Sequence, residues 1–362
     1  MPGIYTHNYI FRKSVEGILK NRSRSYLNRS IEILFSTPEH FKAGLFGSIG
    51  PNIFDYMNIR GNRGSYGNEI TFSLHDKNCR GFLQHMTDIV LNNKDSRNEW
   101  SSVQRAYLLG YISHIISDSI LHPYIFYSSG FPDKLNKSDI NHWRKKNLRF
   151  EYNIDNFFIY RDELGSVISS IEEMIPATHL KGKRVVWPSI KYLILESLKR
   201  ENELLFKKYF LDIKAEKIDG DTGFVKNFDK IPSRIMLSYK IKRTVNPRWI
   251  NIIDKLCENP ITYSDFFVRY PPPKRVDEDA MNIHLGRWQY PAEQRGFRYE
   301  SVLHLIKQSI EQIVRVWEMV EPAIYGVKPF NLDEMEYFSA YTGENEVYFD
   351  QMKIKDPVRL KV

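Results

Sequence analysis

Three side chains of types that bind metals recur at four-residue intervals in the middle of the chain: His114, Asp118 and His122. Each four-residue step on an α-helix turns 400°, so the three share one face and drift by about 40° per step. The two histidines lie roughly 12 Å apart along the axis, too far to bind one ion. The spacing favours several metals, with Asp118 bridging between an ion near His114 and another near His122. The competing interpretation is three unrelated polar residues, each hydrogen-bonded in a core.

The composition is that of a large globular chain with a net positive charge. Of the 362 residues 42% are hydrophobic and 14% aromatic, enough to bury the core of one large or two smaller domains. The net charge of +8 favours anionic partners such as phosphate esters, anionic lipid or nucleic acid. The basic residues are scattered, and no clear nucleic-acid module of basic and aromatic residues is visible.

Cysteine usage and the N-terminal sequence indicate the cellular compartment. Cys79 and Cys257 stand far apart without a CxxC motif, which disfavours a disulfide framework and a thiolate zinc site. The N-terminus lacks the basic start and apolar core of a signal peptide. The longest apolar stretch, residues 106–126, contains histidines and an aspartate that argue against a membrane span. We therefore expect a cytoplasmic protein without a transmembrane segment.

Apolar residues recur with a helical period along most of the chain, which predicts an all-α, multi-helix bundle. The helix that contains His114 should cover residues 101–122, because a residue before proline disfavours helical backbone and Pro123 follows His122. Residues 213–245 are charged and show no clear period, so we interpret them as a loop or insertion. We expect the following further helices: 9–19, 24–40, 74–91, 138–158, 167–175, 190–210, 249–257 and 299–320.

The expected organisation is a single helical metal-binding domain over residues 1–325 and a C-terminal tail over 326–362. Within the domain, residues 165–275 form a variable helical insertion with an extended proline stretch at 271–273, and residues 276–325 contain the closing helix. Two further features add polar groups. A glycine-rich loop contains Asn52 and Asp55, and Asn147, Glu151 and Asp155 form a second stripe at four-residue spacing on one helix.

Four stretches of the chain resemble the bacterial zinc-dependent phospholipase C family, which is related to fungal zinc nucleases of single-stranded nucleic acid and to the N-terminal part of GPI-specific phospholipase D. The His-x3-Asp-x3-His-Pro-Tyr motif at 114–124 is fairly specific, and the others support it by their order. The segment at 288–291 and the helix that follows it resemble the closing segment of proteins in an uncharacterised branch of the family. The four stretches are Met-Pro-Gly-Ile-Tyr-Thr-His at 1–7, Gly-Pro-Asn-Ile-Phe-Asp-Tyr at 50–56, the helix at 107–124 and the stripe at 147–155.

The resemblance implies an all-α bundle with up to three zinc ions. It implies His75, His114 and Asp118 as ligands of one zinc together with position 52, and His7 with the bridging Asp118 as ligands of a second. His122 and Glu151, with position 147, would hold the third. The family usually has Asp at 52 and His at 147, whereas this chain has Asn52 and Asn147. A neutral amide is a poor zinc ligand, so we expect fewer metals here, with Asp55 as a substitute ligand or catalytic base.

The sequence leaves three functions open. The first is a zinc-dependent phospholipase C-like phosphodiesterase, in which a metal-activated water attacks a phosphodiester. A phospholipid is one candidate substrate, and peripheral contact with an anionic membrane is one expectation. The second is a degenerate relative with a binding or structural role and reduced metal content. The third is an HD-type metal phosphohydrolase, suggested by His40 and the dipeptide His75-Asp76, which requires Asp76 as a ligand.

Overall fold

The structure is a computed structural model, and helices dominate the part of the chain that it describes, which confirms the predicted all-α fold. Within that part, the strands form a single two-stranded antiparallel sheet in which Ala177 pairs with Val186. The described residues are 3–20, 25–57, 66–93, 100–132, 137–161, 174–180, 183–210, 228–244, 278–292, 296–324, 326–327, 332, 335 and 339–358.

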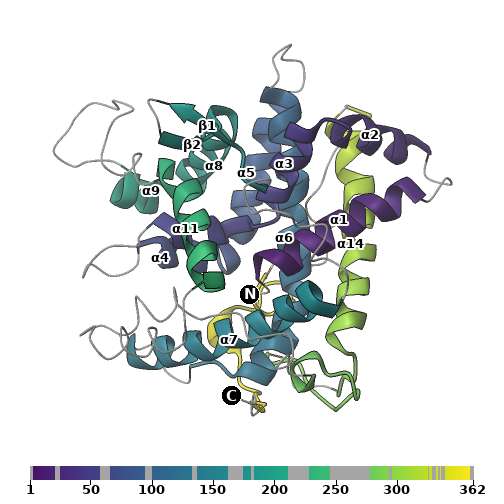
Figure 1. Cartoon of the computed structure of the whole chain (residues 1–362), viewed down its shortest axis with the longest axis vertical. Coiled ribbons are helices and arrows are strands. Elements are labelled where there is room, and N and C mark those ends of the chain that lie inside the picture. The colour runs from purple at the N-terminus through teal and green to yellow at the C-terminus, as the bar shows by residue number, and fades with distance from the viewer. Residues whose placement is uncertain are drawn as a thin grey trace.

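The elements follow one another as Figure 1 shows. The first half contains α1 (Ile4–Lys20), α2 (Ser25–Phe35), α3 (Pro38–Gly47), the 3-10 helix η1 (Gly50–Met57), α4 (Tyr66–His75), α5 (Cys79–Asn92), α6 (Trp100–Ser129) and α7 (Lys137–Arg161). The second half contains β1 (Ala177–Leu180), β2 (Lys183–Val186), α8 (Pro188–Glu201), α9 (Glu203–Phe210), α11 (Ile231–Thr244), η5 (Asp279–Met281), α14 (Val302–Ile324) and η7 (Phe349–Gln351).

Helix α6 is the central element of the fold. From Val103 to Phe126 every side chain on it is buried, and a helix that is apolar on all sides belongs inside a protein. It packs against α1, α3, α5, α7, α8 and α14, and Figure 1 shows it running through the middle of the molecule. Gly110 allows a close approach of α3, because a Cβ there would overlap the carbonyl oxygen of Gly44 on α3.

The prediction that this helix ends at His122 is wrong, because α6 continues through Pro123 to Ser129. Proline has no N–H to donate to the carbonyl four residues earlier, which here belongs to Ser119. The burial of residues 123–126 outweighs that local cost, since leaving the helix at His122 would expose Tyr124 and Phe126. His122 therefore lies within a helix rather than at its end.

Two other differences concern the second half of the chain. The charged region interpreted as a loop contains α11, whose Ile231 and Ile235 are fully buried while its basic residues hide the helical period. The helix expected at 190–210 is divided at Asn202, whose side-chain oxygen accepts a hydrogen bond from the N–H of Leu205 at 2.9 Å and caps α9. The helix at 249–257, the proline stretch and residues 167–173 lie outside the described residues.

The C-terminal residues 339–358 pack back onto the helices, beside α7 in Figure 1. The N–H groups of Asp356 and Val358 donate to the carbonyls of Tyr127 and Ser128, at 2.9 and 2.7 Å, and so tie this segment to the end of α6. The domain boundaries given above stay a prediction. In the part of the chain that the structure describes, every helix is too short or too polar to cross a membrane.

Candidate metal centre

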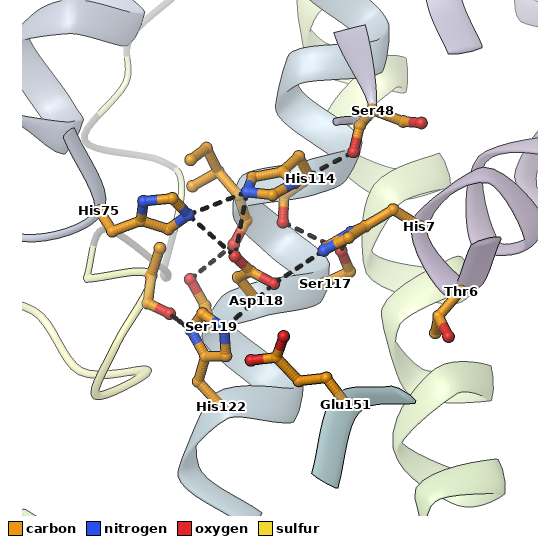
Figure 2. A network of polar contacts seen from close by, with 12 residues as sticks. Thr6, His7, Ser48, His75, His114, Ser117, Asp118, Ser119, His122 and Glu151 are labelled. Atoms are coloured by element: carbon orange, nitrogen blue, oxygen red, sulfur yellow. Dashed lines mark hydrogen bonds and ion pairs between the residues drawn. The ribbon is translucent and has the colours of Figure 1, made fainter. Parts of the chain in front are cut away.

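Six of the residues predicted to bind metal come together in the interior, around Asp118 (Figure 2). The N-terminal turns of α1 contribute His7, and α4 contributes His75 as its last residue. Helix α6 contributes His114, Asp118 and His122 from one face, as the four-residue spacing predicts, and α7 contributes Glu151. His7 is 2% exposed, Glu151 is 3% exposed and the other four are fully buried.

The Asp118 carboxylate lies at the centre of four imidazole rings. Its Oδ1 is 3.1 Å from Nε2 of His7 and 3.4 Å from Nε2 of His122. Its Oδ2 is 3.0 Å from Nε2 of His114 and 3.2 Å from Nε2 of His75. Each carboxylate oxygen therefore faces a different pair of histidines, which is the geometry that a bridging ligand requires.

Backbone carbonyls fix the tautomer of three of these rings. A carbonyl oxygen only accepts hydrogen bonds, so each ring must donate its Nδ1–H and keep a lone pair on Nε2. Such outer partners orient metal-binding histidines and set which nitrogen is free. The pairs are His75 with the carbonyl of Thr71 at 2.7 Å, His114 with that of Ser48 at 3.0 Å, and His122 with that of Ala340.

His7 is oriented by a serine rather than by a carbonyl. Its Nδ1 lies 2.9 Å from the hydroxyl oxygen of Ser117, and that hydroxyl donates its own hydrogen to the carbonyl of His114, also at 2.9 Å. The hydroxyl oxygen is thus an acceptor toward His7, which must donate from Nδ1. In its neutral form, each of the four histidines would therefore present an Nε2 lone pair toward Asp118.

The charge states of the histidines and of Asp118 favour a bound cation in this cluster. Burial lowers the pKa of His75, His114 and His122, so these rings are neutral near pH 7. Burial opposes ionisation of Asp118, and only positive charge on the surrounding histidines outweighs it and holds the pKa of Asp118 well below the usual range, so with these rings neutral the carboxylate lacks the positive charge that its ionised form needs. In these neutral rings, with Nδ1 as the donor, the Nε2 lone pairs face one another, as at the 3.0 Å contact between Nε2 of His75 and Nε2 of His114.

Several of these buried atoms are left without a hydrogen bond. Among the described residues, Nε2 of His7, Nε2 of His122 and both carboxylate oxygens of Asp118 have no hydrogen-bond partner, and such buried groups are costly. Ligand atoms of His7, His114 and Asp118 all lie within 4.8 Å of one another. Imidazole nitrogens and a carboxylate are the ligands that zinc prefers, so the residues present fit zinc.

The side chain of Asn147 lies between Ser129 and Glu151. Its side-chain nitrogen donates to Oε1 of Glu151, and its oxygen accepts a hydrogen bond from the hydroxyl of Ser129 at 3.1 Å. Both ends of the amide are therefore engaged. Asn147 orients Glu151, whose carboxylate points toward His122 in Figure 2.

The residues of the glycine-rich loop lie beside the cluster. Asn52 is half-buried, and its side-chain oxygen has no hydrogen-bond partner among the described residues. Oδ1 of Asp55 accepts a hydrogen bond at 2.9 Å from the hydroxyl of Thr71, whose carbonyl orients His75. Asp55 therefore reaches the cluster through Thr71. Its predicted role as base or ligand stays a prediction, as do the individual ligand assignments.

The contacts of Asp76 argue against the HD-type hypothesis. That hypothesis needs Asp76 as a ligand, but its Oδ1 accepts a hydrogen bond from the N–H of Phe349 at 3.0 Å. His40, the other residue invoked, pairs through Nδ1 with the carbonyl of Leu34 at 3.0 Å.

Asp155 has a supporting role that the sequence did not reveal. It is fully buried, and its Oδ1 accepts hydrogen bonds from the N–H and the hydroxyl of Thr6, at 2.9 and 2.7 Å. It thereby caps the first turn of α1 and fixes the residue next to His7. The four-residue spacing between Glu151 and Asp155 was the feature of the sequence that could have indicated this role. The sequence also provided no indication that Ala340 and Tyr341, far along the chain, contact two of the histidines.

A comparison with protein families agrees with this geometry. The model of a family described as zinc dependent phospholipase C matches residues 6–207, more than half of the chain. The chain belongs to this family. The matched range includes every residue predicted to bind metal, from His7 to Glu151. No curated protein and no solved structure matches the chain.

Proposed function

We propose that this protein is a zinc-dependent phosphodiesterase of the phospholipase C type. One observation supports this most strongly: the Nε2 atoms of four histidines converge on the carboxylate of Asp118 in a buried cluster. Membership of the zinc-dependent phospholipase C family supports phosphodiester hydrolysis as the general reaction. A phospholipid is one candidate substrate, and anionic membrane surfaces are candidate contacts for a chain of net charge +8.

The proposed ligand sets follow the grouping around Asp118. His75 and His114 share its Oδ2 and would hold one ion, while His7 shares its Oδ1 and would hold a second. His122 and Glu151 would hold a third. When bound, zinc lowers the pKa of water to near neutrality, which supplies a nucleophile, and it neutralises charge on phosphoryl oxygens.

The protein's own residues keep these ligands ready. The hydrogen bonds to Nδ1 prevent the rings from turning, and burial excludes bulk water, which strengthens every charge interaction in the cluster. Asp55, half-buried at the edge of the cluster, is the candidate proton acceptor.

Metal analysis together with a hydrolysis assay tests the proposal. We expect protein purified without chelators to retain about two or more zinc ions per chain, as a multinuclear site requires. It should hydrolyse a chromogenic phosphodiester and then a phosphatidylcholine vesicle, and chelation should abolish both reactions. Zinc content below about one ion per chain would overturn the proposal, because these ligands would then serve another purpose.

A second candidate is a relative with fewer metals and a binding role. The engagement of Asn147 with Glu151 and Ser129 favours it, since a neutral amide that is already hydrogen-bonded at both ends is a poor zinc ligand. The double variant Asn52→Asp, Asn147→His separates the two functions. If the chain is degenerate, the double variant should gain zinc and diesterase activity over an inactive wild type. Robust turnover by the wild type would exclude the second candidate.

A further inference from the structure

Residues 339–349 form a segment near the C-terminus that lies directly on the metal centre, and we call it the C-terminal strap. The N–H of Ala340 donates to the backbone carbonyl of His75 at 3.1 Å. The carbonyl of Ala340 accepts the hydrogen bond from Nδ1 of His122. A single residue of the strap thus bridges two elements that carry predicted ligands, the end of α4 and the middle of α6.

The next residue, Tyr341, packs its ring against the same two histidines. Its centroid lies 5.3 Å from that of His75, with the planes 20° apart, and 5.6 Å from that of His122, with the planes 30° apart. Phe72 and Phe349 each lie 5.2 Å away and hold the buried tyrosine ring in place. The side faces of both imidazoles are therefore fixed by Tyr341, while their Nε2 atoms face Asp118.

Phe349 at the end of the strap and Gly343 in its middle make further contacts that involve none of the predicted ligands. Phe349 donates its N–H to Asp76 at 3.0 Å and packs 5.3 Å from Trp143 of α7. Gly343, with φ of +73°, lies so close to the carbonyl oxygen of Ser119 that a Cβ would overlap it. That carbonyl is the one for which Pro123 supplies no N–H. The strap is thus seated where α6 lacks a helical hydrogen bond.

We propose that the C-terminal strap is a positioning element of the metal centre, in which Ala340 and Tyr341 orient His122 and His75 for zinc. This inference rests on the zinc site of the proposed function. Outer partners of metal-binding histidines, such as the Ala340 carbonyl, typically change metal affinity about 10- to 100-fold when they are lost. The family match ends at residue 207, so the strap is a part of the centre that the match does not reach.

Gly343→Ala tests the proposal with a matched control. The added methyl group must push the strap away from Ser119 without altering any predicted ligand. Gly296→Ala is the control, because Gly296 has nearly the same φ, +74°, but a Cβ there meets nothing within 4 Å. We expect the zinc affinity of the Gly343→Ala protein to fall about 10- to 100-fold, and that of the control to change by less than about twofold.

Two variants of Tyr341 keep the test decisive if Gly343→Ala does not fold. Tyr341→Leu removes the ring that packs on both imidazoles but keeps an apolar side chain in the core, whereas Tyr341→Phe keeps the ring. We expect weaker zinc binding for the leucine variant and near wild-type binding for the phenylalanine variant. Co²⁺ loaded in place of zinc should show altered ligand-field bands only in the leucine variant.

The outcomes separate this inference from the proposed function. If wild-type protein binds zinc and Gly343→Ala or Tyr341→Leu is less stable in chelator yet binds zinc equally well, the strap is merely structural and the inference is overturned. Wild-type protein without zinc would overturn the proposed function and the inference together. Diesterase activity in the wild type with unchanged affinity in folded strap variants would overturn the inference alone.

Discussion

At the scale of single residues, Asp118 determines both the metal affinity and the metal-free stability of the centre. Asp118→Asn should lose most bound zinc, because a neutral amide is a poor ligand. In excess chelator at pH 8 the same variant should be more stable than wild type by on the order of 1–3 kcal/mol, since its NH₂ donates to a buried Nε2 lone pair that has no partner in wild type. Denaturant unfolding with and without zinc measures both effects.

The exposed variant Glu311→Gln is the control for Asp118→Asn and should change neither value. A metal-free Asp118→Asn protein that is less stable than the metal-free wild type would contradict the acceptor-only description of the cluster.

Asp155 acts on the centre only through the first turn of α1. Asp155→Ala removes the acceptor of the buried Thr6 N–H and hydroxyl, and should cost about 1–3 kcal/mol of unfolding free energy. It should also weaken the zinc next to His7, because the start of α1 positions that ligand. Asp155→Asn keeps one acceptor oxygen and should show a smaller loss in both thermal unfolding and zinc titration. Equal losses in the two variants would point to the charge of Asp155 rather than to its capping role.

The sequence predicted the side chains that gather around Asp118, but it did not predict the groups that orient them. The face shared by His114, Asp118 and His122 follows from the helical period alone, and the resemblance supplied His7, His75 and Glu151. The partners that orient the rings are mostly backbone carbonyls, which every residue carries, so residue type gives no signal for Ser48, Thr71 or Ala340.

At the scale of elements, burial overrides local preference. The sequence predicts most of the helices of the first half, because each repeats apolar residues with one period. It does not predict that α6 continues past Pro123, since that continuation depends on how residues 123–126 pack in the core. Helix α11 was missed for a related reason, because its buried Ile231 and Ile235 are followed by the basic residues Lys240, Lys242 and Arg243, which hide the helical period.

The contact between α5 and α8 gives a pH-dependent prediction. Burial raises the pKa of Glu201 from 4.5 to about 7, even with Nε2 of His85 at 3.7 Å from its carboxylate. A raised carboxyl pKa means that the folded state binds the proton more tightly, so stability falls as the pH rises from 4.5 to about 7. Glu201→Gln should remove this loss and stabilise the protein at pH 8.5 by on the order of 1–2 kcal/mol, allowing for solvent screening.

The gain from Glu201→Gln should shrink toward zero as the pH approaches 4.5, which denaturant unfolding across that range measures. Glu203→Gln is the control, because Glu203 is exposed and its hydrogen bond with Lys207 lowers its pKa. That variant should not stabilise the protein at any pH. A constant gain for Glu201→Gln at all pH values would contradict the buried-carboxyl explanation.

At the scale of the whole molecule, a second buried polar cluster joins helices away from the centre. Arg105 of α6 pairs with the fully buried Glu321 of α14, at 3.0 Å through Nε, and Ser30 of α2 contacts both. Glu321→Gln leaves the Arg105 charge without its partner and should cost about 3–5 kcal/mol. Zinc affinity should stay at the wild-type value, because none of these residues belongs to the metal centre. A parallel loss of zinc would show that the two clusters are coupled through α6.

Removal of zinc should destabilise the elements around the metal centre more than those around the Arg105–Glu321 pair. The metal centre joins α1, α4, α6, α7 and the C-terminal strap, which are distant in sequence, whereas the Arg105–Glu321 pair joins α2, α6 and α14. A ligand present at 1,000 times its dissociation constant adds about 4 kcal/mol of stability, and elements that depend on it open locally once it is gone. Hydrogen exchange after chelation should therefore show faster exchange at the start of α1, the end of α4, the Glu151 turn of α7 and the strap, with protection retained in α2 and α14. Uniform loss of protection would instead mean that the whole fold requires zinc. In that case the Arg105–Glu321 pair would not be sufficient to keep α2, α6 and α14 folded without the metal.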